Sequence, residues 1–161
     1  MVIGVGNPFR GDDGAGLRAI ALARPDLPAG VRVVESDGEP ARVLDAWEGA
    51  DLAVVVDAMR SGAEPGTVVR AEAGRDALPE PVGGGSTHAL GIGEAVALGR
   101  ALDRLPARVV VFGIEGERFD AGVGLTPAVA RGAAQAAHLV CAEVPTGRPV
   151  RARTTGGAPC A

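Results

Sequence analysis

The sequence is poor in aromatic residues and contains neither tyrosine nor lysine. Aromatic residues make up 2% of its 161 positions, whereas 47% of them are hydrophobic, and alanine, valine and leucine dominate that fraction. This apolar content is higher than that of disordered chains. The length is that of a single domain, and it is enough to bury a sizeable hydrophobic core. We therefore expect one globular domain, packed internally from small aliphatic side chains.

All of the basic charge is arginine, and acidic residues outnumber it. The formal net charge is -4, which argues against a surface for nucleic acid or for an anionic membrane. No apolar run approaches the roughly 20 residues that span a bilayer. The N-terminal residues do not resemble a signal peptide, in which a charged region is followed by an apolar one. We therefore expect a soluble, cytoplasmic protein that binds neither nucleic acid nor membranes.

Cysteine is also rare. The two cysteines, Cys141 and Cys160, match no metal or redox spacing and cannot build a disulfide framework. This usage fits the reducing cytosol, and it leaves the fold to depend on packing.

Apolar runs typical of buried strands alternate along the chain with segments of helical periodicity. The segment after the third run is joined to it by few residues, so we expect it to return antiparallel. The alternation predicts an α/β fold, a three-layer α/β/α sandwich with a mostly parallel twisted sheet and one antiparallel strand. The expected strands are 2–5, 31–36, 52–56, 67–71 and 108–114, and the expected helices are 15–21, 40–48, 90–98 and 127–141.

Two adjacent carboxylates, Asp12 and Asp13, stand where the first strand turns into the first helix. An aspartate there can cap backbone N–H groups and meet the positive end of the helix dipole, but capping needs one carboxylate. A dinucleotide-binding turn would need glycine at the sixth position from Gly4, where Phe9 stands, and two carboxylates would repel a pyrophosphate. We expect Asp12 to support the turn and Asp13 to point to a site, while a purely structural Asp13 stays open.

Asp57 and His88 are two further candidates for the same site. Asp57 ends a continuous apolar run, and ligands bind beyond the carboxyl ends of parallel strands, although the carboxylate could instead accept N–H groups of the following loop. His88 stands at a helix start, where the dipole favours a neutral ring able to bind metal or act as a base, or it is structural. Together with Asp13 these residues can converge at one edge of the sheet and bind zinc or nickel.

Four segments, in this order, resemble the hydrogenase maturation proteases, the nickel-dependent endopeptidases of NiFe hydrogenase assembly. The resemblance covers residues 1–142 and implies an endopeptidase that removes the C-terminal extension of a hydrogenase large-subunit precursor after nickel insertion. It also implies that Asp13, Asp57 and His88 are the catalytic residues and the positions that bind nickel or a substitute metal. The four segments are GVGNPFRGDDGAG, VVVDAMRSGAEPGTV, STHALG and FGIEGERFDAGVGLTPAV.

The resemblance leaves two mechanisms open. Nickel already in the precursor docks against these side chains while a carboxylate acts as base, or a metal bound to them polarises the scissile carbonyl and activates water. We favour nickel carried by the substrate as a recognition element, with zinc or cadmium as substitutes. The alternative function is a non-catalytic nickel-binding chaperone or adaptor in metalloenzyme assembly. In either case we expect a monomer, with a protease-like domain over 1–144 and a flexible tail over 145–161.

Overall fold

The computed structural model describes residues 1–73 and 87–145, and for residues 87–90 it describes only the helical backbone. Five strands form one sheet in the order β2-β1-β3-β5-β4. Four of the strands are parallel, and β4 runs antiparallel to β5, which confirms the predicted mostly parallel sheet. The strands are β1 (Val2–Val5), β2 (Val33–Ser36), β3 (Leu52–Met59), β4 (Val68–Glu72) and β5 (Arg108–Glu115).

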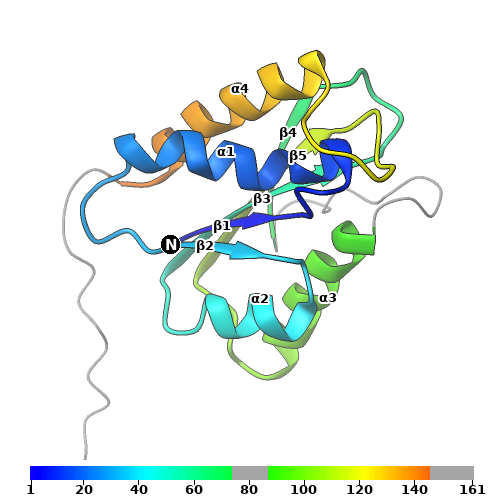
Figure 1. Ribbon diagram of the computed structural model, residues 1–161. Helices are drawn as coiled ribbons and strands as arrows, with labels where there is room; N and C mark the ends of the chain where they lie inside the picture. Colours follow the sequence, from blue (N-terminus) through cyan, green and yellow to red (C-terminus); the bar gives the residue numbers. More distant parts are fainter. Residues whose placement is uncertain (74–86, 146–161) are drawn as a thin grey trace, which may run out of the picture.

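Helices cover both faces of this sheet, as predicted (Figure 1). One apolar cluster lies between the sheet and α1 and α4, and the other lies under α2 and α3. Successive residues of β3 belong to opposite clusters, Val54 and Val56 to the first and Ala53 and Val55 to the second, because strand side chains alternate. The helices are α1 (Ala15–Ala23), α2 (Pro40–Ala46), α3 (Thr87–Ala101) and α4 (Pro127–Glu143), with short 3-10 turns η1 (Gly11–Gly14) and η2 (Arg24–Asp26).

The antiparallel strand has a different neighbour from the one expected. The short connection after β3 suggested that β4 returns along β3, but β4 pairs with β5, where Ala71 lies opposite Val111. The reason is that β3 already has parallel partners on both sides, β1 and β5. The strand therefore takes the free edge of the sheet.

Gly16 allows α1 to lie directly on the ends of β1 and β3. A Cβ at this position would collide with the carbonyl oxygens of Val5 and Val56. The close approach brings η1, which contains both Asp12 and Asp13, against the end of β3.

An ion-pair cluster links β4 and β5 to the last turn of α4. Glu143 accepts hydrogen bonds from Arg108 at 2.7 Å and from Arg70 at 3.0 Å. The Arg70 hydrogen bond, aided by that of Arg108, holds the pKa of Glu143 below its usual range against the effect of burial. A carboxyl group with a lowered pKa in the folded state stabilises the fold above its unfolded pKa, and that contribution is lost as the pH falls through the folded value.

Glu143→Gln should therefore lower the free energy of unfolding at neutral pH, and the effect should fade in acid. Because Arg70 and Arg108 are 40% and 45% exposed, solvent screening limits the loss to about 0.5–1 kcal/mol. Urea unfolding should show the full difference at pH 7, and the difference should begin to shrink only as the pH falls below about 4.5 and vanish below the lowered folded pKa. Glu48→Gln, which breaks an exposed pair with Arg104, is the matched control with a smaller effect. A difference that persists undiminished in acid would contradict this assignment.

None of the helices in the described ranges combines the length and the apolar character required to cross a bilayer.

Candidate functional site

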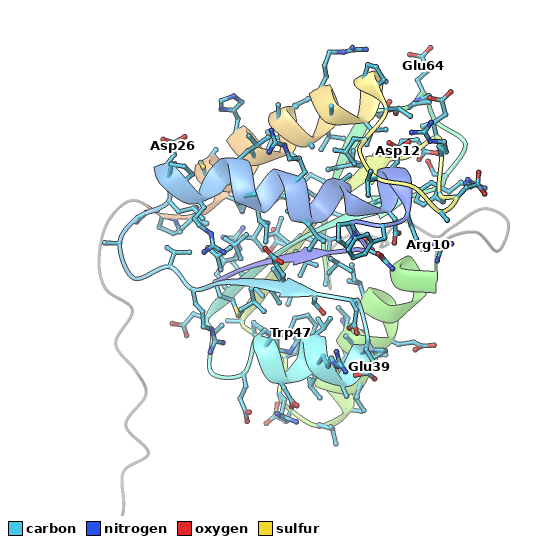
Figure 2. All side chains as sticks on the ribbon, in the orientation of Figure 1. Arg10, Asp12, Asp26, Glu39, Trp47 and Glu64 are labelled. Carbon is cyan, nitrogen blue, oxygen red and sulfur yellow. The ribbon has the colours of Figure 1, made fainter. Side chains whose placement is uncertain are left out.

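The loops that follow β1, β3 and β5 meet at one edge of the sheet, here called the carboxyl edge. The chain leaves β1 through α1 on one face and reaches β3 through α2 on the other, so β1 and β3 flank a topological switch point. Figure 2 shows Arg10, Asp12 and Glu64 together at this end of the molecule and Asp26 at the opposite end. Ligand sites of open α/β sheets form at such a point.

Buried carboxylates are concentrated at the carboxyl edge. Burying a carboxylate is costly unless hydrogen-bond donors or a cation offset the lost hydration, so the partners of each group indicate its role. Each of these residues is at most 3% exposed. They are Asp12, Asp13, Asp57 and Glu115.

Asp12 is a structural residue that ties together two loops. Its carboxylate accepts hydrogen bonds from Thr126 N at 2.7 Å, Arg118 N at 2.9 Å, Glu117 N at 3.0 Å and Thr126 Oγ1 at 3.1 Å. The supporting role predicted for Asp12 is confirmed, but the segment it holds is the loop between β5 and α4. The residues at the N-caps of η1 and α1 are Arg10 and Gly14, and neither makes a side-chain cap.

Asp13 lies beside the end of β1. Its Oδ2 accepts the N–H of Asn7 at 3.0 Å, and the Asn7 side chain in turn accepts the N–H of Phe9 at 2.9 Å. Gly6, with a φ of +140°, presses against the Asp13 carbonyl so closely that a Cβ could not fit. The turn after β1 and the Asp13 carboxylate are therefore fixed to each other.

Asp57 lies near the end of β3, opposite Gly113 of β5. It is two residues beyond Val55, which belongs to the cluster under α2 and α3. Because side chains two apart on a strand share a face, Asp57 points to the face that α3 covers. This is the face from which the sequence predicts His88 to approach.

His88 lies in the first turn of α3, and its side chain falls outside the described residues. The backbone of that helix is anchored by Gly91, where a Cβ would collide with the carbonyl oxygen of Gly38 in the loop after β2. The start of α3 therefore lies at the carboxyl edge, on the same face as Asp57. The contacts of the imidazole stay a prediction.

The donor set suits a divalent cation. Among the described side chains, no three His, Cys, Asp or Glu groups converge closely enough to hold a metal ion. Asp13 and Asp57, two of the three predicted ligands, are both buried and lie near the switch point. Two carboxylates with one imidazole are ligands that nickel and zinc accept.

Glu115 is a residue whose role the sequence analysis missed, because it was assigned to the loop after β5. In the structure it ends β5 and accepts hydrogen bonds from Ser61 Oγ at 2.7 Å, Ser61 N at 2.9 Å and Gly62 N at 2.9 Å. It thereby fixes the loop that follows β3. The available signal was an acid at the end of an apolar run, the same pattern that singled out Asp57.

A cavity of about 340 Å³ opens at the ends of β1 and β2. It lies next to the turn that holds Asp13, and its wall combines backbone, aliphatic and charged groups. Such a cavity can receive side chains of a peptide presented to the carboxyl edge. Its lining includes Gly6, Pro8, Leu17, Val34, Asp37 and Arg42.

Comparison with known proteins gives a consistent result. The model of the family described as hydrogenase maturation protease matches residues 20–143. The chain is 31% identical over 135 residues to the hydrogenase expression/formation protein HupD of Rhodobacter capsulatus, covering 81% of this chain and 63% of that protein, less than two thirds of its length. It is 30% identical over 146 residues to HupD of Bradyrhizobium diazoefficiens, covering 88% and 75%. The fold is similar to that of the hydrogenase maturating endopeptidase HybD from E. coli, with a TM-score of 0.72 at 23% identity, covering 86% and 87%.

Proposed function

Because this chain belongs to the hydrogenase maturation protease family, we propose that it is an endopeptidase that removes the C-terminal extension of a NiFe hydrogenase large-subunit precursor after nickel insertion. The observation that supports this most is the pair of buried carboxylates, Asp13 and Asp57, at the switch point beside a cavity of about 340 Å³. Gly6 and Pro8 of the turn bonded to Asp13 line this cavity, so a peptide in it would lie against that turn.

Nickel enters this proposal as part of the substrate. Asp13, Asp57 and His88 bind the nickel of the loaded precursor, and zinc or cadmium can take its place at these ligands. We expect the site to distinguish a loaded precursor from an empty one, because only the loaded precursor offers a nickel ion to these three side chains. One carboxylate then serves as the base for the water that attacks the scissile peptide bond. Asp12 and Glu115 hold the loops around the site and contact no substrate.

Incubation with nickel-loaded and nickel-free precursor tests this function. We expect the loaded precursor to lose its C-terminal extension, as seen by intact-mass measurement, and the empty precursor to stay full length. Binding without cleavage would favour the alternative, a non-catalytic nickel-binding chaperone or adaptor. Equal cleavage of both precursors would contradict nickel as the recognition element.

Removing metal should leave the fold intact. The two apolar clusters and the hydrogen bonds to Asp12 and Glu115 involve no metal, so chelation should shift the midpoint of thermal unfolding by no more than about 1–2 °C. Circular dichroism before and after treatment with EDTA measures this, with an untreated sample carried through the same dialysis as the control. Unfolding caused by the chelator would make a metal structural.

We propose further that residues 1–144 form the catalytic domain and that the protein acts as a cytoplasmic monomer. The predicted tail over 145–161 falls, apart from Pro145, outside the described residues. The same chelation samples, passed through size-exclusion chromatography, report the oligomeric state.

A further inference from the structure

Phe9 stands apart from the other aromatic residues of this protein. It exposes 69% of its surface, and in the described part of the chain only Val123, at 76%, is a more exposed large hydrophobic residue. An exposed aromatic side chain contributes little to folding, and aromatic residues are enriched among the residues that dominate binding energy at protein interfaces. The other aromatic residues, all buried, are Trp47, Phe112 and Phe119.

Backbone hydrogen bonds link the turn that holds Phe9 to the loop that holds Val123, and these two exposed residues are together called the rim patch. Gly122, next to Val123, donates its N–H to the Phe9 carbonyl at 2.9 Å, and Gly11 donates to the Gly122 carbonyl at 2.8 Å. Asn7 closes the turn by accepting the Phe9 N–H at 2.9 Å. The backbone under the patch is therefore held by hydrogen bonds before a partner binds. Binding then costs little conformational entropy in these two loops.

The rim patch borders the candidate site. The turn that displays Phe9 also donates the Asn7 N–H to the Asp13 carboxylate, and Pro8, the residue before Phe9, lines the cavity. The loop that displays Val123 is tied to Asp12 through Arg118 and Thr126. A protein substrate that presents a peptide to Asp13 and the cavity must bring its folded surface close to this patch.

We propose that the rim patch is a docking contact for an apolar depression on the folded body of the large-subunit precursor, separate from the peptide that is cut. This inference rests on the proposed function, because the precursor is chosen as occupant from the continuity between the patch and the site. The patch supplies affinity for the precursor protein, while Asp13 and Asp57 act on the bond.

Phe9→Ala tests the docking contact. Titration calorimetry with the nickel-loaded precursor should show Kd raised by at least about tenfold, as for an aromatic hot spot, and cleavage should show a matching rise in KM with kcat within about twofold. The double variant with Val123→Ala should bind more weakly still. Leu102→Ala removes a side chain that is 52% exposed after the end of α3, at the opposite edge of the sheet, and should change neither constant.

The two proposals fail in different ways. If the wild-type protein cuts the precursor and Phe9→Ala leaves Kd and KM unchanged, the docking contact is wrong and the protease function stands. If the wild-type protein binds without cutting and Phe9→Ala weakens binding, the protease function is wrong and the docking contact stands. A wild-type dimer that Phe9→Ala dissociates would assign the rim patch to a second copy of this chain and overturn the inference.

Discussion

His88→Ala protein is expected to leave the C-terminal extension on the nickel-loaded precursor while it unfolds almost like the wild type. The first turn of α3, which contains His88, lies at the carboxyl edge on the face to which Asp57 points. Losing the only nitrogen donor leaves two carboxylates, a harder ligand set that favours magnesium or calcium over nickel. We expect a rate loss of about a hundredfold or more, since the change also removes a neutral base.

The stability readout separates a site residue from a structural one. The shift in the midpoint of thermal unfolding should correspond to a loss of no more than about 0.5 kcal/mol in the free energy of unfolding. This is the range of an ordinary surface substitution. His138→Ala is a matched control, because it removes the other histidine, which is exposed on α4, and should cut normally. Asp57→Asn should show the same loss of cleavage as His88→Ala. Normal trimming by His88→Ala would remove His88 from the site and leave too few ligands for the metal proposal.

Much of the fold could be predicted because it depends on local patterns. Apolar runs and helical periodicity predicted the parallel strands and the helices on both faces, and α2 begins at Pro40, where the sequence predicts it, with Glu39 as its N-cap. The place of β4 could not be predicted, since its pairing with β5 depends on which strand edges the rest of the sheet leaves free. Trp47 is fully buried in the core.

The roles of the acids were harder to predict for a related reason. Asp12 accepts hydrogen bonds from residues 105 to 114 positions away, and Glu115 accepts them from residues 53 and 54 positions away. No local spacing contains such partners. A carboxylate at the end of a strand therefore has the same sequence signature whether it holds a loop, as Glu115 does, or faces a site, as we propose for Asp57.

Asp12→Asn is the substitution expected to cost the most stability. Asp12 has no exposed surface, and its four hydrogen bonds come from N–H and O–H donors. An asparagine has one acceptor oxygen, and its NH₂ group would face backbone donors that cannot turn away. Hydrogen bonds to charged groups contribute about 1.5–3 kcal/mol, and buried donors left without acceptors cost about 1–3 kcal/mol each, so we expect a loss of about 2–4 kcal/mol.

Urea unfolding of Asp12→Asn and Asp13→Asn, followed by the cleavage assay on both, decides between the two acids. We expect Asp13→Asn to change the free energy of unfolding by about 1 kcal/mol or less, because the asparagine oxygen can still accept the Asn7 N–H, through a weaker uncharged hydrogen bond. It should nevertheless stop cleavage. Asp12→Asn should cut the precursor at temperatures where it remains folded, since its partners are loop N–H groups rather than substrate. A stable, inactive Asp12→Asn beside a fully active Asp13→Asn would reverse the assignment and place Asp12 in the site.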